Sequence, residues 1–393
     1  MVSNSDRKLR ILTFNGTYLP GFKAGGPIRS IANMAERLNN TFEFYILTKD
    51  RDFGDVHPYP NIKVDQWNMV RNEMVYYHSP EKATISNMKK IINDLDFDIV
   101  YLNGFFSSYT IKYLLLRRLK LIGNFPTIIL PRGDLSKGAL QLKRLKKKLY
   151  MKLSLVLGLY NNLFWQATSD SELQDIKNNF KRNVLIKKVE NLSSLPTTFD
   201  QKKGDTKKKG YLKIIFLSRI TEVKNLKFAI EALRGLEGNI EFNIFGPISD
   251  LVYWEECQKL INKLPKNIMV KYHGSVENSK VSRIMKENNV LFLPTFGENY
   301  GHVIVEAFIT GIPVLISDRT PWRELEKYSV GWDISLNHPE EFKRKLQNLI
   351  YLEDEEYSKY KKFTANYVNK FIDTDDKTDD LKKLFYQALQ GKF

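Results

Sequence analysis

The sequence predicts an α/β protein built from two doubly wound, Rossmann-like domains, each with a parallel sheet. The first observation is length, because 393 residues exceed one ordinary hydrophobic core and suggest two domains of about 150–200 residues. The second is an alternation of short β-branched or aromatic runs with amphipathic stretches, which is typical of βαβ units. The third is that this alternation stops at a polar segment near residue 200 and then begins again.

The first half alternates strands and helices from residue 10 to residue 188. Pro27 stands at the start of a helix, where its missing N–H group costs nothing. The runs expected to form strands are Arg10–Phe14, Phe42–Thr48, Asp98–Asn103, Thr127–Leu130, Leu163–Thr168 and Val184–Lys188. The runs expected to form helices are Pro27–Leu38, Glu81–Leu95, Tyr109–Lys120 and Gln141–Leu157.

Residues 196–210 are polar and aperiodic, so we interpret them as a linker between domains at 1–195 and 211–393. Residues beyond Pro339 read as helical, and the terminal helix could pack back on the first domain. Two such domains would face each other across a ligand cleft at the carboxyl ends of their strands. Expected strands are Lys213–Ser218, Ile240–Phe245, Ile268–His273, Val290–Pro294 and Pro313–Ser317, and expected helices are Lys224–Leu236, Leu251–Leu264, Lys280–Asn288 and Tyr300–Thr310.

The composition is that of an ordinary globular protein, with 42% hydrophobic and 27% charged residues. The single cysteine, Cys257, excludes an internal disulfide, and we interpret it as a packed small residue rather than a nucleophile. No signal peptide opens the chain, and no apolar run approaches the roughly 18 residues of a membrane span. We therefore expect a cytoplasmic protein.

The net charge of +16 is confined to the first half of the chain. Residues 1–210 carry 35 Lys and Arg against 19 Asp and Glu, whereas residues 211–393 carry 26 of each. One interpretation is a lysine-rich solvated surface. The other is a domain that faces an anionic partner, either a membrane leaflet or nucleic acid.

A buried strand ending near Pro294 runs into a loop that opens a helix near Tyr300. Such a helix N-terminus offers backbone N–H groups and a positive dipole end to a diphosphate, and Gly301 lets the backbone approach closely. Glu298 lies in the loop, and Glu306 lies inside the helix among apolar neighbours. Sugar or ribose hydroxyls could partner these carboxylates, although spacing alone equally allows a structural carboxylate bonded to backbone or to a lysine.

The string Glu298-x7-Glu306-Ala307-x3-Gly311-x-Pro313-Val314 resembles the signature of the retaining family 4 (group 1) glycosyltransferases. This resemblance implies the GT-B fold, no cofactor and no metal. It also implies that Glu298 contacts the transferred sugar and Glu306 the ribose. The continuation through Pro321-Trp322-Arg323 and Val330-Gly331-Trp332 resembles a bacterial branch that assembles surface polysaccharides, including lipopolysaccharide and capsule.

The same family places an Arg and a Lys after the first strand of the second domain, and Arg219 and Lys224 match that pair. The chemistry needs such residues, because a departing nucleoside diphosphate gains negative charge that fixed cations stabilise. The alternative is that both merely flank a strand end. The predicted donor site further includes residues Gly25, Gly26, Gly246, Val276, Asn299, Tyr300, Gly301 and His302.

The first domain supplies two candidates for the acceptor or sugar side. Arg132 follows a strand at the expected ligand edge and could reach an acceptor pyrophosphate. Many family members carry a histidine after the fourth strand of this domain, whereas this sequence has Asn103 at that point. Asn103 is therefore a candidate replacement.

Metal use is not expected, because the two Asp-x-Asp strings at residues 94–98 read as a helix-to-strand turn. The five histidines show no ligand spacing, and Arg219 with Lys224 would neutralise the phosphates without a metal.

The stretch from Lys143 to Leu153 is rich in lysine, with Leu145, Leu149, Leu153 and Val156 at helical spacing. One interpretation is a covering helix of the first domain with a solvated lysine face. The other is a helix resting on an anionic membrane leaflet, peripheral to the inner face of the cytoplasmic membrane.

The sequence thus predicts a retaining, metal-independent glycosyltransferase that moves a sugar from a nucleoside diphosphate to a glycan acceptor. A polyprenyl diphosphate is the expected carrier of that acceptor. Two alternatives remain at this point. A nucleotide-sugar epimerase of related fold would need no acceptor. A basic nucleic-acid binder would fit the charge, although no recognised binding motif is present and nucleic acid is not the expected partner.

Overall fold

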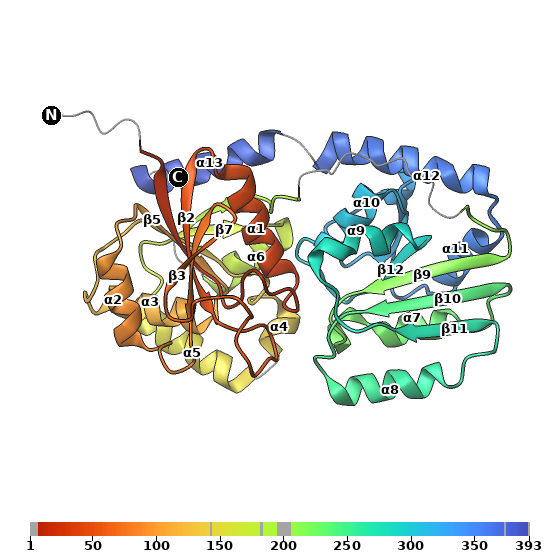
Figure 1. The fold of residues 1–393 in the computed structure, drawn as a ribbon, viewed down its shortest axis with the longest axis horizontal. Helices are drawn as coiled ribbons and strands as arrows, with labels where there is room; N and C mark the ends of the chain where they lie inside the picture. The colour runs from red at the N-terminus through yellow and green to blue at the C-terminus, as the bar shows by residue number, and fades with distance from the viewer. Residues whose placement is uncertain (1–6, 142–143, 181–183, 195–205, 373–374, 392–393) are drawn as a thin grey trace. The chain divides into compact units, whose positions relative to one another are not determined.

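The computed structural model of the protein describes residues 7–141, 144–180, 184–194, 206–372 and 375–391. The chain divides into two compact units, which are described separately: unit 1 contains residues 1–192 and 375–393, and unit 2 contains residues 193–374 (Figure 1). Of the expected linker, residues 196–205 lie outside the described residues.

Unit 1 is organised around a sheet with the strand order β3-β4-β2-β1-β5-β6-β7-β8. Its strands are parallel except for the antiparallel pair β3–β4. The strands are β1 (Leu9–Phe14), β2 (Phe42–Lys49), β3 (Trp67–Val70), β4 (Glu73–His78), β5 (Ile99–Asn103), β6 (Thr127–Leu130), β7 (Phe164–Ala167) and β8 (Leu185–Lys188).

Successive residues of a strand point to opposite faces of the sheet, and Ile11 and Leu12 accordingly lie in two separate hydrophobic cores. Helices cover both faces because each face carries apolar side chains. The core on one face is closed by α1 (Gly26–Leu38) and α13 (Asp375–Gln390). The other includes side chains of α2 (Ile85–Asp94), α3 (Ser108–Arg118) and α6 (Asp170–Asn179). Two further helices, α4 (Lys137–Gln141) and α5 (Arg144–Val156), follow β6.

The last helix, α13, belongs to unit 1 although it ends the chain. Its Phe385 ring lies 5.2 Å from the Phe42 ring and 5.5 Å from the Tyr101 ring, and Lys187 donates to Gln387 at 2.9 Å. The second expected domain, 211–393, therefore ends before this helix, which returns to unit 1 as the sequence analysis had allowed.

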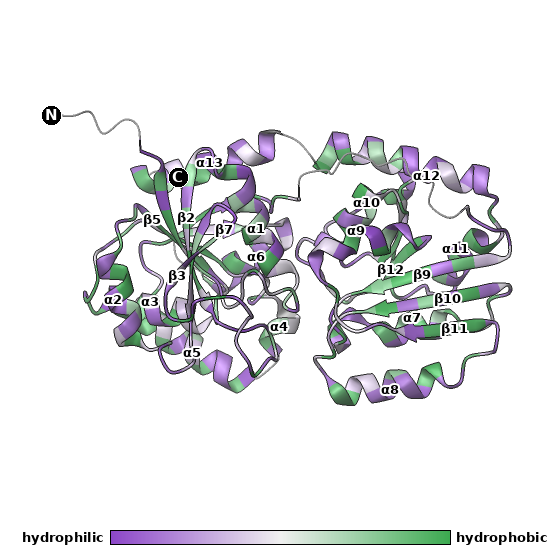
Figure 2. Cartoon of the chain, in the orientation of Figure 1, coloured by the Kyte–Doolittle hydropathy of each residue, from purple (hydrophilic) through white to green (hydrophobic). Residues whose placement is uncertain are grey.

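Unit 2 has a six-stranded parallel sheet in the order β11-β10-β9-β12-β13-β14 and one large core. Hydrophobic residues fill the middle of β9 and β12 (Figure 2). The strands are β9 (Tyr211–Leu217), β10 (Asn239–Phe245), β11 (Ile268–Tyr272), β12 (Val290–Leu293), β13 (Val314–Ser317) and β14 (Gly331–Ile334). The helices and turns are η1 (Glu222–Lys224), α7 (Leu226–Ala232), α8 (Leu251–Ile261), α9 (Asn278–Lys286), α10 (His302–Thr310), η2 (Leu325–Tyr328), α11 (Pro339–Tyr351), α12 (Asp354–Tyr367) and η3 (Val368–Ile372).

These two parallel-sheet α/β units confirm the expected fold class. The sequence analysis missed the hairpin β3–β4, the helix α6 and the edge strand β14. The run Glu73–His78 is rich in aromatic and β-branched residues and would have indicated a strand. Cys257 is fully buried, and Asp96 and Asp98 pair with Arg10 and Arg7 at the start of β5, in agreement with a helix-to-strand turn.

The orientation of α5 corrects one expectation. The interpretation of α5 as a covering helix with a solvated lysine face placed its leucines against the domain, but Leu145 and Val156 are each 84% exposed. The inward face instead contains Tyr150, Met151 and the fully covered Ser154. Among the described residues, no helix is long and apolar enough to cross a membrane.

Glu73, the first residue of β4, makes the stability of unit 1 depend on pH. It is 1% exposed, and burial raises the pKa of its carboxyl group from 4.5 to about 7. The folded protein therefore holds this proton more tightly than the unfolded chain does. Stability should fall as pH rises from the unfolded pKa through the folded pKa, by up to about 3 kcal/mol.

We therefore expect Glu73→Gln to unfold at a higher urea concentration than the unmodified protein at pH 8, and to show little difference at pH 4. Glu277→Gln, at an exposed position, serves as the control and should leave the pH profile unchanged. A Glu73→Gln protein with the unmodified pH profile would contradict the assignment.

Candidate functional site

The candidate site of unit 2 lies where its sheet changes direction. From β9 the chain proceeds outward through β10 and β11, and then returns to the other side of β9 with β12, β13 and β14. In an open parallel sheet, ligands bind at the carboxyl ends of the strands beside such a switch point. The two strands at the switch are β9 and β12, and the loops that follow them carry Lys224 and Glu298.

Backbone hydrogen bonds hold these two loops together. The carbonyl oxygen of Val223 accepts from the Phe296 N–H at 2.8 Å and from the Thr295 hydroxyl at 3.0 Å. The Glu298 N–H donates to the Arg319 carbonyl at 3.1 Å, which ties the loop after β13 to the same edge. The three loops therefore form one connected polar edge.

An ion pair between Lys224 and Glu298 crosses the switch point. The side chains are 13% and 17% exposed, so both remain accessible to a polar ligand while being shielded from bulk water. Lys224 is held in place because it ends the short turn η1, and the single residue Asn225, with a left-handed backbone (φ 58°), joins that turn to α7. Arg219, in the same loop, is exposed to solvent.

The helix α10 begins at this edge. Gly301 caps this helix with φ 77°, a backbone conformation that residues other than glycine rarely adopt. A Cβ atom at this position would lie 2.9 Å from the Ile304 side chain. The first N–H groups of a helix lack intrahelical acceptors and carry its positive dipole end, which suits an anion. His302 is half-buried in the first turn, and Glu306 is half-buried one turn further on.

Trp322 is a positioning residue to which the sequence analysis gave no role. Its indole N–H donates to the Tyr300 carbonyl, and its ring lies 5.7 Å from the rings of both Tyr300 and Phe308. This anchors the residue before Gly301 to the loop after β13. The Pro321-Trp322-Arg323 string in the sequence could have indicated that Trp322 belongs to this site.

Gly246 and Val276 lie just after β10 and β11, at the same edge of the sheet. A Cβ on Gly246 would lie 1.9 Å from the Ser218 carbonyl oxygen, so only glycine allows the loops after β9 and β10 to pack this closely. Val276 follows β11 and packs partly against the unit 2 core.

In unit 1, Asn103 and Arg132 come together at the ends of β5 and β6. The Asn103 amide oxygen accepts from Arg132 Nε at 3.1 Å and Nη2 at 2.7 Å, and Arg132 Nη1 donates to the Asn191 amide oxygen at 2.6 Å. Asn191, which follows β8, was not anticipated. Burial lowers the pKa of Arg132 from its ordinary value, but its guanidinium stays charged at neutral pH.

The backbone around Arg132 is held in an unusual conformation. Arg132 has φ 58°, and the next N–H group, from Gly133, donates to the buried Glu172 carboxylate at 2.7 Å. The Glu172 carboxylate also accepts from the N–H and hydroxyl of Thr168, at 2.8 and 2.7 Å. Gly25 (φ 69°) and Gly26 lie at the start of α1, after the first strand of the unit.

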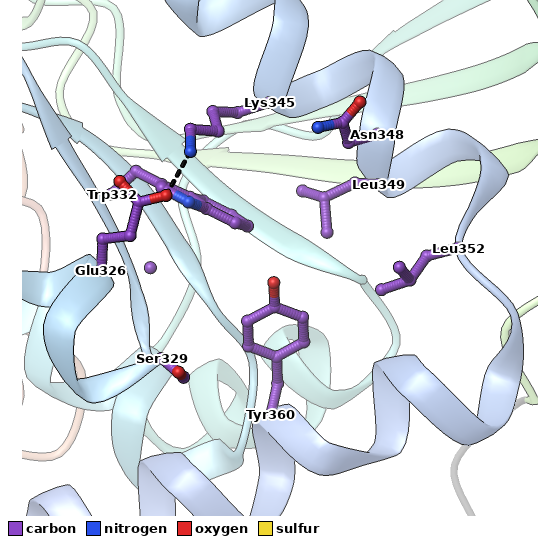
Figure 3. A pocket seen from close by; sticks show the side chains of 9 residues that line it. Glu326, Ser329, Trp332, Lys345, Asn348, Leu349, Leu352 and Tyr360 are labelled. Atoms are coloured by element: carbon purple, nitrogen blue, oxygen red, sulfur yellow. Dashed lines mark hydrogen bonds and ion pairs between the residues drawn. The ribbon is translucent and has the colours of Figure 1, made fainter.

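A cavity of about 320 Å³ lies elsewhere in unit 2, against the first residues of β14 (Figure 3). This is the amino end of a strand, whereas the candidate site is at the carboxyl ends. Lys345 pairs there with Glu326 and lies over the Trp332 ring, and the Tyr360 hydroxyl points into the space (Figure 3). None of the expected site residues lines this cavity.

Residues 198–367 match the family model "Glycosyl transferases group 1". A curated protein from Klebsiella pneumoniae, described as an uncharacterized 41.2 kDa protein in the cps region, is 22% identical over 228 residues. That alignment covers 56% of this chain and 60% of the relative, so the chain spans less than two thirds of the relative's length.

Solved structures resemble nearly the whole chain. Sucrose-phosphate synthase from Thermosynechococcus elongatus has a TM-score of 0.72 at 13% identity, covering 98% of this chain and 100% of that one. HepE from Anabaena, in complex with UDP and glucose, has a TM-score of 0.69 at 14% identity, with 96% and 100% covered. WaaG, a glycosyltransferase involved in lipopolysaccharide biosynthesis, has a TM-score of 0.63 at 13% identity, with 92% and 95% covered.

These likenesses establish the fold, and the family match covers the segment that contains Lys224, Glu298 and Glu306. The chain therefore has the two-domain GT-B fold, and residues 198–367 are similar to the glycosyl transferases group 1 family.

Proposed function

We propose that the protein is a retaining, metal-independent glycosyltransferase of family 4. It transfers a sugar from a nucleoside diphosphate to a glycan acceptor. The observation that carries this proposal is the Lys224–Glu298 ion pair at the β9–β12 switch point, inside the segment matched by the family model. The Anabaena structures, which contain UDP with glucose or UDP-glucose, support a sugar nucleotide as the donor.

In this proposal the diphosphate lies at the N-terminus of α10, against Lys224 and Arg219. Breaking the bond to the sugar leaves additional negative charge on the diphosphate, and a cation fixed beforehand stabilises that charge without reorganising. Glu298 accepts hydrogen bonds from sugar hydroxyls, and Glu306 accepts them from the ribose. Asn299, Tyr300, Gly301 and His302 shape the loop and the helix start.

In the proposed reaction the acceptor hydroxyl attacks the same face of the sugar from which the diphosphate leaves. The departing phosphate oxygen takes the hydroxyl proton, the new glycosidic bond forms, and the bond to the diphosphate breaks. No separate protein base is then required. The sugar keeps its anomeric configuration.

The acceptor side is assigned to unit 1. The hydrogen bonds of the Arg132 guanidinium go to two neutral amides, and the nearby Glu172 carboxylate bonds Gly133 and Thr168 instead, so the guanidinium can attract an anionic group. A diphosphate that links a glycan to a polyprenyl lipid has the required charge. Such an acceptor places the enzyme at the inner face of the cytoplasmic membrane. The cps-region relative and the WaaG likeness support surface polysaccharide synthesis as the process.

The reaction itself can be tested with UDP-glucose, related sugar nucleotides and a polyprenyl-diphosphate-linked glycan. We expect nucleoside diphosphate to be released only when the acceptor is present, at a rate unchanged by EDTA, and the NMR coupling constant of the product should show retained configuration. An isomerised sugar nucleotide formed without acceptor would instead identify an epimerase. Release that depends on an added divalent cation would overturn the metal-independent assignment.

Lys224→Met should lower the turnover rate about 100- to 1,000-fold, because it removes a charge that stabilises the departing diphosphate. Lys224→Arg should recover part of that loss. The matched control is Lys209→Met, which breaks an exposed ion pair with Glu353 in the same unit. Steady-state kinetics checks both. Equal activity of Lys224→Met and Lys209→Met would refute the donor-site assignment.

Arg132→Gln should raise the acceptor KM about tenfold or more, since a charge-assisted bond contributes about 1.5–3 kcal/mol. UDP should still raise the melting temperature of this variant as it does for the unmodified protein, because donor binding is assigned to unit 2. Arg71→Gln, at an exposed position in unit 1, is the control. An unchanged acceptor KM in Arg132→Gln would contradict the role.

A further inference from the structure

The outer face of α5 is apolar, although it faces solvent. Leu145, Leu149, Leu153 and Val156 follow one another at helical spacing and are 84%, 60%, 53% and 84% exposed. We call these four residues the leucine face. Contiguous apolar surface of this kind on a folded protein marks an interaction site, whereas single exposed apolar residues do not.

The outward orientation is fixed by the contacts on the opposite side of the helix. The Tyr150 hydroxyl bonds the Tyr160 hydroxyl at 2.6 Å, and Ser154 is 1% exposed. Lys147 also turns inward: its ammonium donates to the Ala139 carbonyl at 2.7 Å and lies 4.6 Å from the Phe106 ring centre. Rotating α5 to bury its leucines would break all of these contacts, so the leucine face is a built feature of unit 1.

The charged residues that flank the leucine face along the chain are all basic. The sequence contains no Asp or Glu between Asp134 and Asp170. Arg144, Lys146, Lys148 and Lys152 are exposed on the same helix. Any partner therefore meets apolar and cationic groups side by side.

The end of α3 extends this surface. The Arg118 side chain donates to the Leu157 carbonyl just beyond α5, and Leu119 and Leu121 are 65% and 41% exposed. Lys120 lies between them and is also exposed. Apolar residues flanked by cations thus recur on two adjoining segments.

We propose that the leucine face docks into the interface of an anionic lipid bilayer, with its leucines among the upper acyl chains and the flanking cations at the headgroup phosphates. An amphipathic helix lying in the membrane plane needs this combination. A second copy of the chain fits less well, because pairing two leucine faces would bring two sets of like charges together. Membrane docking deepens the proposed function. It rests on that function in one respect only, namely that docking would bring the enzyme within reach of a lipid-linked acceptor.

The first test is co-sedimentation of the full chain with vesicles, which requires no substrate. We expect binding to phosphatidylcholine vesicles that contain phosphatidylglycerol, and little binding to phosphatidylcholine alone. The triple variant Leu145→Ser, Leu149→Ser and Leu153→Ser keeps every charge and should bind at least about tenfold more weakly. The matched control is Leu251→Ser with Val252→Ser, two residues that are 70% and 68% exposed on α8 in unit 2.

The second test separates insertion from simple electrostatic attachment. Cys257 is fully buried, so a Leu149→Cys protein can be labelled at the new thiol with an environment-sensitive fluorophore. We expect a blue shift and increased intensity on adding anionic vesicles. The same label on a Leu251→Cys protein should not respond.

The outcomes are distinct. Equal vesicle binding by the triple serine variant and the unmodified protein, or no response of the label at position 149, would overturn the proposal. A dimer in sedimentation velocity that the triple serine variant abolishes would also overturn it in favour of a second copy. Normal vesicle binding without UDP-induced stabilisation would reject the proposed function and leave the membrane surface standing. Normal UDP stabilisation without vesicle binding would reject the membrane surface and leave the proposed function standing.

Discussion

The hydrogen bonds accepted by the Val223 carbonyl hold the candidate donor site together. They fasten the loop after β12 to the loop after β9, across the point where the strand order of unit 2 reverses. A parallel sheet brings the carboxyl ends of its strands to one edge, but only such cross-links fix the side chains there. Lys224 and Glu298 meet because the hydrogen bonds that join their loops lie close to both residues in the sequence, at Val223, Thr295 and Phe296.

Unit 1 also holds a cation at the carboxyl ends of its strands, but with different hydrogen-bond partners. Its half-buried cation, Arg132, is oriented by the amide oxygens of Asn103 and Asn191, whereas Lys224 in unit 2 pairs with a carboxylate. An amide oxygen accepts hydrogen bonds without neutralising the guanidinium. Asn103 suits this arrangement because its single amide oxygen accepts two guanidinium N–H groups.

The net positive charge of the chain is divided unevenly between its two halves. The excess of lysine and arginine belongs to the first 210 residues, and part of it surrounds the leucine face of α5. Here the hydrophobic spacing alone was misleading. A leucine stripe normally identifies the buried side of a helix, but the Tyr150, Ser154 and Lys147 contacts bury the other side.

The sequence by itself determined the two α/β units and most of their strands, because period and turn chemistry are local properties. The roles that it assigns to residues of the candidate donor edge stay predictions. It missed the hairpin β3–β4, the helix α6, the strand β14 and the partners Asn191 and Trp322, and the interpretation of α5 as a covering helix turned its leucines the wrong way. Only the tertiary structure decided these features. Sheet order, the return of α13 to unit 1 and the outward turn of the leucine face depend on contacts between residues far apart in the chain, which no local pattern records.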